Sequence, residues 1–251
     1  MINRKDTHLL VDVGPRNPRF DSGSRLVLPE LRQQGVTHLD AVFLTHFDQD
    51  HIGGLESLLK RVSVDHVVMV TPAGIDDAHR QLLIQAGVRS DQLVVYSSAI
   101  NLDFPGLTVE CMPGILQSDR NDNDQSPYLI FHFGTDSAVL TGDASSLVEA
   151  QWIAQGAKPA RILKAGHHGS SQSMSPEWLA AIKPAFVVFS AGRNNQWHHP
   201  TQEATARAAA SGAQVFRTDR DGSVRFFADG GGRLKLAPAE DRPPLFQLFQ
   251  R

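Results

Sequence analysis

The sequence predicts an α/β protein, a four-layer αββα sandwich in which two mixed sheets pack face to face with helices outside. Short apolar segments of strand length alternate with segments of helical periodicity along all 251 residues. The second half of the chain repeats the rhythm of the first, as expected if each half forms one sheet with its own helices. Hydrophobic residues make up 41% of the chain and charged residues 20%, which is enough apolar material for a large core.

The first half contains predicted strands and helices in turn. Apolar and β-branched runs predict strands at 8–14, 39–45, 65–70, 92–97 and 107–112. Helical spacing predicts helices at 24–35, 54–62 and 76–87. The first of these helices carries an internal proline, and the last stops at Gly87. A polar loop is expected at 117–126.

The second half continues the alternation. Its predicted strands are 127–134 and 137–143, which form a hairpin, followed by 160–166 and 185–192. Its predicted helices are 145–156, 175–183 and 201–212. Two further strands, 213–219 and 223–228, are expected to pair as a hairpin through the turn "RDG". One domain is expected over 1–238, followed by a flexible, proline-rich tail at 239–251.

Composition excludes several classes of protein. The net charge is −3, so any nucleic acid must be bound by local basic groups or by a metal rather than by bulk positive charge. The lone cysteine, Cys111, excludes an internal disulfide and a thiolate zinc site. No apolar run approaches the roughly 20 residues that cross a bilayer, and no signal peptide is evident. We therefore expect a chain that is soluble as given and has no membrane contact of its own.

The segment "LTHFDQDHIGG" places His46, Asp48, Asp50 and His51 within six positions, between a predicted strand and a predicted helix. In an extended chain alternate residues point the same way, so His46, Asp48 and Asp50 can converge, and His51 reaches the same place from the side. Imidazole nitrogen and carboxylate oxygen are ligands of zinc, manganese and iron. The alternative is a polar loop with solvated charges. We favour a metal site, because converging charges repel without a cation.

Further donors follow predicted strands in the second half. Asp143 ends "VLTGD", His167 and His168 lie in "LKAGHHGSS", and His198 and His199 lie in "NQWHHPT". Each motif comes before a helix, where the loops of one edge of the sandwich gather. The alternative for Asp143 is to cap the helix that follows. In each histidine pair, one ring is expected to bind metal and the other to contact a ligand or the substrate.

Taken in order, the motifs "THFDQDHIGG", "TGDA", "LKAGHHGSS" and "HHP" resemble the metallo-β-lactamase superfamily. More narrowly, together with "LLVDVGPR", "NDNDQS" and "RTDRDGSV", they resemble the C-terminal hydrolase domain of the ComEC family of competence proteins. The resemblance implies an αββα fold, two divalent metal ions (Mn²⁺ or Zn²⁺), and hydrolysis of phosphodiester bonds in incoming, single-stranded DNA. It also implies that the chain is the soluble part of a larger membrane channel protein, attached to the inner membrane and facing the periplasm or the cell exterior.

The resemblance also implies roles for individual residues. One ion would take His46, Asp48 and a histidine of the 167–168 pair. The other would take Asp50, His51 and His199, with Asp143 bridging. The implied metal ligands are therefore His46, Asp48, Asp50, His51, Asp143, His167 and His199.

Other positions match residues that support these ligands or the substrate. Asp12 matches a buried aspartate that steadies the metal loop by accepting hydrogen bonds. Asp50 and His168 are the expected catalytic residues, with His168 protonating the leaving oxygen or gripping phosphate. The expected substrate contacts are Asn123, Ser126, Lys164, Ser170 and Arg193. For Lys164 and Arg193 the alternative is a solvated surface cation, and for Ser170 it is a helix cap.

The chain departs from the superfamily pattern in two ways. Most relatives have histidine where Asp48 stands, so this site is richer in oxygen, which shifts its preference toward manganese or iron without excluding zinc. Relatives also begin with a strand and a "VGQGD"-type turn, and this chain starts after that point. We therefore expect its first sheet to lack an edge strand.

Two other functions are compatible with the same motifs. A small-molecule phosphoesterase or lactone hydrolase would need a closed apolar pocket, whereas DNA needs an open basic groove. A module that binds metal and DNA without catalysis is the third possibility. All candidate ligands are present, so the sequence gives no indication that catalysis has been lost.

Overall fold

The structure is a computed structural model that describes residues 1–4, 6–116, 122–229 and 231–238. The predicted tail at 239–251 and residues 117–121, the first half of the predicted polar loop at 117–126, lie outside the described residues. The predicted domain end at 238 stays a prediction. The chain forms two compact units. The first comprises Met1–Ile100, Phe104–Gly106 and Pro113–Pro127, and the second comprises Asn101–Asp103, Leu107–Met112 and the residues from Tyr128 onward.

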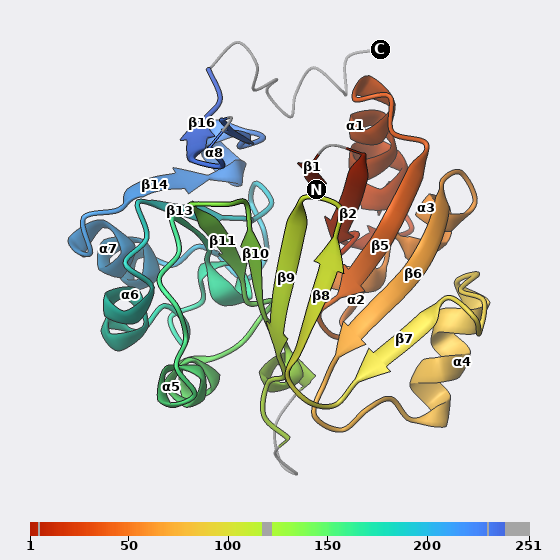
Figure 1. Ribbon diagram of the computed structural model, residues 1–251, viewed down its shortest axis with the longest axis horizontal. Coiled ribbons are helices and arrows are strands. Elements are labelled where there is room, and N and C mark those ends of the chain that lie inside the picture. The colour runs from red at the N-terminus through yellow and green to blue at the C-terminus, as the bar shows by residue number, and fades with distance from the viewer. Residues whose placement is uncertain (5, 117–121, 230, 239–251) are drawn as a thin grey trace. The chain divides into compact units, whose positions relative to one another are not determined.

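The first unit is built on a mixed five-stranded sheet (Figure 1). In sheet order its strands are β1 (Ile2–Arg4), β2 (Thr7–Val11), β5 (His38–Leu44), β6 (Ser63–Val70) and β7 (Leu93–Tyr96). β1 runs antiparallel to β2, and the other neighbours are parallel. The expectation that this sheet lacks an edge strand is wrong, because β1 occupies the edge beside β2.

The first unit also contains short helices, most of which contribute apolar side chains to the core beside this sheet. They are the π-helix η1 (Gly23–Val27), α1 (Leu28–Gln33), α2 (Gln49–Ile52), α3 (Leu55–Leu59), α4 (Asp77–Gln85) and the 3-10 helix η2 (Asp122–Gln125). Alternate residues of one strand, Val42 and Leu44 of β5, join one apolar core with Leu31 of α1, Leu58 of α3 and Leu83 of α4. The short strands β3 (Arg16–Asn17) and β4 (Phe20–Asp21) form a separate hairpin.

The second unit is built on a mixed seven-stranded sheet. In sheet order its strands are β14 (Gln214–Arg217), β13 (Phe186–Phe189), β12 (Ile162–Lys164), β11 (Ser137–Leu140), β10 (Tyr128–His132), β9 (Leu107–Met112) and β8 (Ile100–Phe104). β9, β10 and β11 form antiparallel neighbours, whereas β11 to β14 are parallel. The carboxyl ends of β11, β12 and β13 therefore meet at one edge of the sheet.

Three longer helices and several short elements complete the second unit. They are α5 (Ser146–Ala154), η3 (Gly166–Gly169), α6 (Pro176–Ile182), α7 (Gln202–Ala210), α8 (Thr218–Asp221) and the hairpin of β15 (Phe226–Ala228) and β16 (Leu234–Leu236). Trp152 of α5, Trp178 of α6 and Tyr128 of β10 are fully buried, with ring centroids 5.7 to 5.9 Å apart. These aromatic rings fix α5 and α6 to the sheet.

The predicted hairpin through "RDG" is wrong. β14 pairs with β13 in the large sheet, and β15 pairs with β16 instead. Between β14 and β15 the chain forms the short helix α8, where the carboxylate of Asp221 accepts the backbone N–H of Arg217 at 2.8 Å. The guanidinium of Arg217 also pairs with Asp219. Local side-chain bonds of this kind compete with a hairpin turn.

Within the described ranges of the chain, no helix is both long and apolar enough to cross a bilayer.

Gly23 and Gly54 allow two backbone segments of the first unit to touch. A Cβ on Gly54 would lie 2.6 Å from the nitrogen of Gly23, and a Cβ on Gly23 would overlap the carbonyl oxygen of Gly54. The start of η1 therefore rests directly on the start of α3. Glycine, which has no side chain, is the residue that permits this close backbone approach where α3 begins.

Replacement of Gly23 by alanine is expected to lower the free energy of unfolding by at least roughly 2 kcal/mol, because the added methyl group forces the two backbones apart. The matched control is Gly192→Ala, where a Cβ meets nothing within 4 Å, and its expected effect is under about 0.5 kcal/mol. Urea denaturation measures both variants. Equal urea midpoints for Gly23→Ala and the wild type would show that the backbones at Gly23 and Gly54 leave room for a methyl group.

Candidate metal centre

The donor segment of the first unit begins directly after β5 and coils earlier than predicted. His46 follows the strand, Asp48 has extended backbone angles, and Asp50 and His51 lie within α2. The prediction that extended spacing aligns His46, Asp48 and Asp50 is therefore wrong from residue 49 onward. The carbonyl of Asp48 accepts the N–H groups of His51 at 2.9 Å and Ile52 at 3.1 Å, which starts a helical turn. Asp50 and His51 still present ligand atoms within 4.8 Å of each other.

Asp12, which follows β2, fixes this segment through hydrogen bonds. Its Oδ1 accepts the backbone N–H of Thr45 at 2.9 Å, and its Oδ2 accepts the Thr45 hydroxyl at 2.9 Å. Nδ1 of His51 lies 2.7 Å from the same Oδ2. We assign the ring proton to Nδ1, which leaves Nε2 of His51 with a lone pair for a metal.

His46 carries a ring nitrogen that lacks a hydrogen bond. Its Nδ1 lies 3.0 Å from the Thr45 hydroxyl and 3.4 Å from the Ser126 hydroxyl. Its buried Nε2 has no hydrogen-bond partner among the residues that the structure describes, and it lies 3.6 Å from Oδ2 of Asp48, beyond hydrogen-bond range. Leaving a buried acceptor unsatisfied is costly, so a metal ion fits this position.

The carboxyl groups of Asp12 and Asp48 favour their charged forms. Burial works to raise the pKa of Asp12, but the charge and hydrogen bond of His51, with smaller contributions from His46 and Thr45, hold that pKa below its ordinary value. The neighbouring His46 ring lowers the pKa of Asp48. Both carboxyl groups are therefore ionised at neutral pH, the form in which a carboxylate accepts hydrogen bonds or binds a cation.

The second unit gathers its own donors at the carboxyl ends of three neighbouring parallel strands. Asp143 follows β11, the pair His167 and His168 follows β12, and His199 follows β13. Nε2 of His168 lies 3.5 Å from Oδ2 of Asp143, and Nε2 of His167 lies 3.9 Å from the same oxygen. The His167 and His199 ring centroids are 5.6 Å apart. The four side chains thus form one cluster of nitrogen and oxygen donors.

The backbone at the histidine pair is unusual. His167 and His168 have φ values of 46° and 52°, a left-handed conformation that costs energy in residues with a side chain. Nδ1 of His168 lies 2.7 Å from the carbonyl oxygen of Ser190, so the ring donates there and turns Nε2 toward Asp143. The strained turn therefore places two imidazoles beside one carboxylate.

The other members of these motifs are placed differently. Ser145 and not Asp143 is the N-terminal cap of α5, so the capping alternative for Asp143 is wrong. Burial, followed by the charges of His167 and His168, lowers the pKa of His199, and its Nδ1 has no hydrogen-bond partner within the described part of the chain. His198 is exposed.

The expected substrate contacts lie in both units. In the first, Asn123 is buried in η2, and Ser126 lies against His46. In the second, Nζ of Lys164 donates to the carbonyl of Ala165 at 3.1 Å, and Nε of Arg193 donates to the carbonyl of Asp219 at 2.8 Å.

Ser170 is not at a helix start as expected. It follows η3 and is buried, whereas α6 begins at Pro176 with Ser175 as its cap. The helix that follows begins where the sequence predicts it, so Ser170 belongs to the turn after the histidine pair and not to a helix cap.

Two charged side chains hold the segment 171–175 that follows the histidine pair. The buried carboxylate of Glu149 on α5 accepts the N–H groups of Met174 at 2.6 Å and Ser175 at 2.9 Å. From α7, the guanidinium of Arg207 donates to the carbonyls of Ser171, Ser173 and Met174. The segment has no regular secondary structure of its own, so these bonds satisfy its backbone.

Both donor sets suit a divalent metal. Each combines carboxylate oxygen with imidazole nitrogen, and His51 and His168 each have Nδ1 engaged by an oxygen so that Nε2 points outward. Among the residues that the structure describes, Nε2 of His46 and Nδ1 of His199 have no hydrogen-bond partner. Each adds one nitrogen donor to the set of its unit. The chemistry fits zinc, manganese or iron.

Comparison with known proteins identifies the class. Residues 1–192 match the Metallo-beta-lactamase superfamily. Among solved structures, the metallo-beta-lactamase fold protein YhfI from Bacillus subtilis has a TM-score of 0.54, covers 86% of each chain and is 15% identical. The chain belongs to the metallo-β-lactamase superfamily, whose members are metal-dependent hydrolases, typically with two metal ions. The predicted fold class is confirmed.

The curated relatives define a narrower group. ComE operon protein 3 of Bacillus subtilis is 30% identical over 228 residues, which are 88% of this chain and 29% of that protein. Competence protein ComA of Neisseria gonorrhoeae is 27% identical over 239 residues, 92% of this chain and 31% of that protein. Recombination protein 2 of Haemophilus influenzae is 28% identical over 244 residues, 96% of this chain and 29% of that protein. The resemblance to ComEC-type competence proteins is confirmed, and the chain spans under a third of the length of these relatives.

Sequence reasoning missed the residues that hold the donors in place. Thr45 contacts Asp12, His46 and His51, and its position before His46 was the available signal. Glu149 and Arg207 gave no signal, because their partners lie 25 or more positions away. A second group, His38, Asp40 and Asp65, also went unnoticed, with ligand atoms within 4.8 Å of one another. It lies at the opposite ends of β5 and β6 from the predicted donors.

Replacement of Glu149 by alanine is expected to lower the free energy of unfolding by roughly 3 kcal/mol, because it leaves two buried N–H groups without acceptors. The control is Glu177→Ala on the exposed face of α6, with an expected effect under about 1 kcal/mol. Thermal and urea denaturation measure both. Similar losses in the two variants would refute a bracing role for Glu149.

The pH dependence of stability gives an independent test of the same carboxyl group. Burial raises the pKa of Glu149 above its ordinary value of 4.5, so the folded state binds this proton more tightly than the unfolded state. The stability gained from that proton is complete below pH 4.5 and is lost as the pH rises through the folded-state pKa. The destabilisation caused by Glu149→Gln is therefore expected to be largest in acid and to shrink as the pH rises. A constant difference in urea midpoints across this range would contradict a raised pKa.

Proposed function

We propose that this protein is a metal-dependent nuclease that hydrolyses phosphodiester bonds of single-stranded DNA during its uptake. Two observations together support the proposal. Each unit has a set of nitrogen and oxygen donors, and the chain is similar to competence proteins along nearly its whole length. We further propose that the chain is part of a larger protein attached to the inner membrane. It would meet the incoming DNA strand on the periplasmic or exterior side of that membrane.

The superfamily resemblance supports a particular ligand assignment. We assign His46, Asp48 and a histidine of the 167–168 pair to one divalent ion. Asp50, His51 and His199 belong to the other, and Asp143 is shared. Mn²⁺ is compatible with the extra oxygen donor of Asp48, and Zn²⁺ is compatible with the imidazoles.

The bound ions supply a water molecule of lowered pKa and neutralise charge on the phosphate oxygens. The side chains of the chain itself orient the reaction. Asp12 sets the direction of the His51 ring, and the Ser190 carbonyl sets that of His168. His168 already donates its Nδ1 proton to the Ser190 carbonyl, so it is proposed to act in its doubly protonated imidazolium form, with the Nε2 proton passing to the leaving oxygen, while His167 serves as the ligand of the pair. Asp50 is proposed to orient the attacking water.

The substrate contacts are proposed on the same basis. Ser126 lies against His46 in the first unit, and Asn123 lies in the same short segment. In the second unit Lys164 lies at the end of β12, and Ser170 follows the histidine pair. Together with the exposed Arg193, they provide donors for phosphate oxygens.

Replacement of His46 or Asp143 by alanine is expected to lower the rate of single-stranded DNA hydrolysis at least about 10³-fold, equivalent to about 4 kcal/mol, because each removes a proposed metal ligand. Degradation of a labelled oligonucleotide with added Mn²⁺ or Zn²⁺ measures the rate. A chelator should abolish the wild-type activity, and either metal should restore it.

The matched control is His66→Ala, an exposed histidine on β6, which is expected to retain wild-type activity. DNA degradation that persists in both ligand variants would come from a contaminant and would refute the nuclease assignment. Hydrolysis of bis(p-nitrophenyl) phosphate without any cleavage of DNA would instead identify a small-molecule phosphoesterase. Metal and DNA binding without either activity would identify a binding module.

A further inference from the structure

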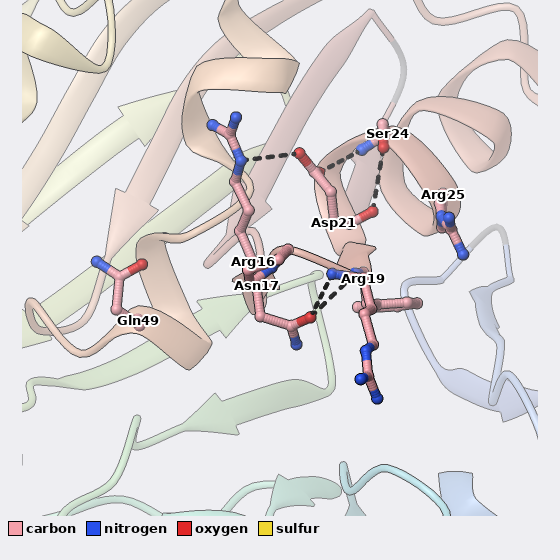
Figure 2. A pocket seen from close by; sticks show the side chains of 9 residues that line it. Arg16, Asn17, Arg19, Asp21, Ser24, Arg25 and Gln49 are labelled. Atoms are coloured by element: carbon pink, nitrogen blue, oxygen red, sulfur yellow. Dashed lines mark hydrogen bonds and ion pairs between the residues drawn. The ribbon is translucent and has the colours of Figure 1, made fainter.

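The hairpin of β3 and β4 forms one wall of an open hollow on the first unit (Figure 2). The hollow has a volume of about 620 Å³, and Arg16, Arg19, Phe20, Asp21, Arg25 and Gln49 are among the residues that line it. Three arginines thus line one small region of a chain whose net charge is −3, and their side chains spread in different directions from the hairpin and the start of η1 (Figure 2). None of these arginines was singled out from the sequence.

Two of the three positive charges are available to a ligand. Arg16 pairs with Glu56 and lies 3.5 Å from Asp21. Arg19 and Arg25 are exposed and form no ion pair with any residue that the structure describes. The guanidinium of Arg25 lies 5.9 Å from the centre of the Phe20 ring, which positions it without neutralising its charge.

The hairpin is held rigid by its own polar side chains. Oδ1 of Asn17 accepts the N–H groups of Arg19 at 2.9 Å and Phe20 at 3.0 Å, which closes the turn. Asp21 accepts the Ser24 N–H at 2.9 Å and the Ser57 hydroxyl at 2.6 Å, so its negative charge is already engaged. These bonds hold the backbone that carries Arg19 and Arg25 before any ligand arrives.

The same hairpin is attached to the donor segment of the first unit. The carbonyl of His51 accepts the N–H groups of Val13 at 2.7 Å and Gly14 at 3.0 Å, just before the hairpin begins. Gln49, which lines the hollow, lies between the donors Asp48 and Asp50 in the chain. A strand bound in the hollow would therefore lie beside the proposed metal ligands of this unit.

We propose that the hollow binds the phosphate backbone of a single nucleic-acid strand through Arg19 and Arg25. This inference rests on the proposed function and adds to it the surface that holds the substrate. Guanidinium groups bind phosphate oxygens through paired, charge-assisted hydrogen bonds. An acidic chain needs such a local cluster, because its overall charge repels a polyanion. The polar, open lining suits an extended strand better than an enclosed small molecule.

Binding without catalysis tests the proposal. Fluorescence anisotropy of a labelled oligothymidylate is measured in EDTA over a series of salt concentrations, with the full chain. Arg19→Ala/Arg25→Ala is expected to weaken binding roughly tenfold at low salt and to reduce the slope of log affinity against log salt by about 1.4, that is, about 0.7 for each lost phosphate contact. Arg19→Lys/Arg25→Lys keeps both charges and is expected to retain affinity within about threefold.

The matched control is Arg32→Ala/Arg80→Ala, which removes two exposed arginines from α1 and α4 and is expected to bind as the wild type does. Wild-type affinity and slope in Arg19→Ala/Arg25→Ala would overturn the proposal, and so would an equal loss in the control. Equal affinity for labelled polyglutamate would show a general anion surface and would also overturn it. If circular dichroism shows the double variant unfolded, Arg19→Ala alone is expected to reduce the slope by about 0.7.

The metal-free measurement separates this proposal from the nuclease assignment. If the arginine variant loses binding and the wild type never cleaves DNA, the hollow is supported as a binding surface and the nuclease assignment is refuted. If the wild type cleaves DNA and the arginine variant binds as tightly as the wild type, the nuclease assignment is supported and the proposed binding role of the hollow is refuted.

Discussion

The carboxylate of Asp12 is the group on which the donor segment of the first unit depends. β2 and β5 are parallel neighbours, so Asp12 and Thr45 emerge at the same edge of the sheet. Asp12 then engages the backbone and hydroxyl of Thr45 and the ring of His51. Thr45 in turn contacts His46. One half-buried carboxylate therefore orients the His51 ring directly and the His46 ring through Thr45, which is how metal sites commonly orient their histidines.

The second unit positions its donors by backbone conformation instead. Within the described residues, positive φ values outside glycine occur at seven positions, and three of them, His167, His168 and Met174, lie in or just after the histidine motif. Each such residue costs roughly 1–3 kcal/mol. Glu149 accepts hydrogen bonds from residues 174 and 175, and Arg207 donates to residues 171, 173 and 174, which offsets the cost at Met174 and fixes the chain just after the histidine pair. The conformation persists because α5 and α7 hold it from outside.

The parts that could be predicted from the sequence are those set by short-range pattern. Strand positions and the placement of Asp143 and His167 after parallel strands follow from apolar runs and from the topology of such sheets. Two predictions failed where local hydrogen bonds overrode the pattern. A side-chain bond from Asp221 accompanies α8 in place of the expected turn, and backbone bonds to the Asp48 carbonyl coil α2 where an extended chain was expected. Glu149 and Arg207 could not be predicted, because their importance depends on partners brought close only by the fold.

The bracing of residues 171–175 has a consequence for motion. Irregular segments on a protein usually exchange their amide hydrogens quickly, because they open without disturbing the helices around them. Here the amides of Met174 and Ser175 donate to a carboxylate on α5, and nearby carbonyls accept from α7. These amides stay paired until the segment separates from α5, and the bonds from α7 to the neighbouring carbonyls oppose that separation. The stretch should therefore behave dynamically as part of the folded core, although it has the backbone of a loop.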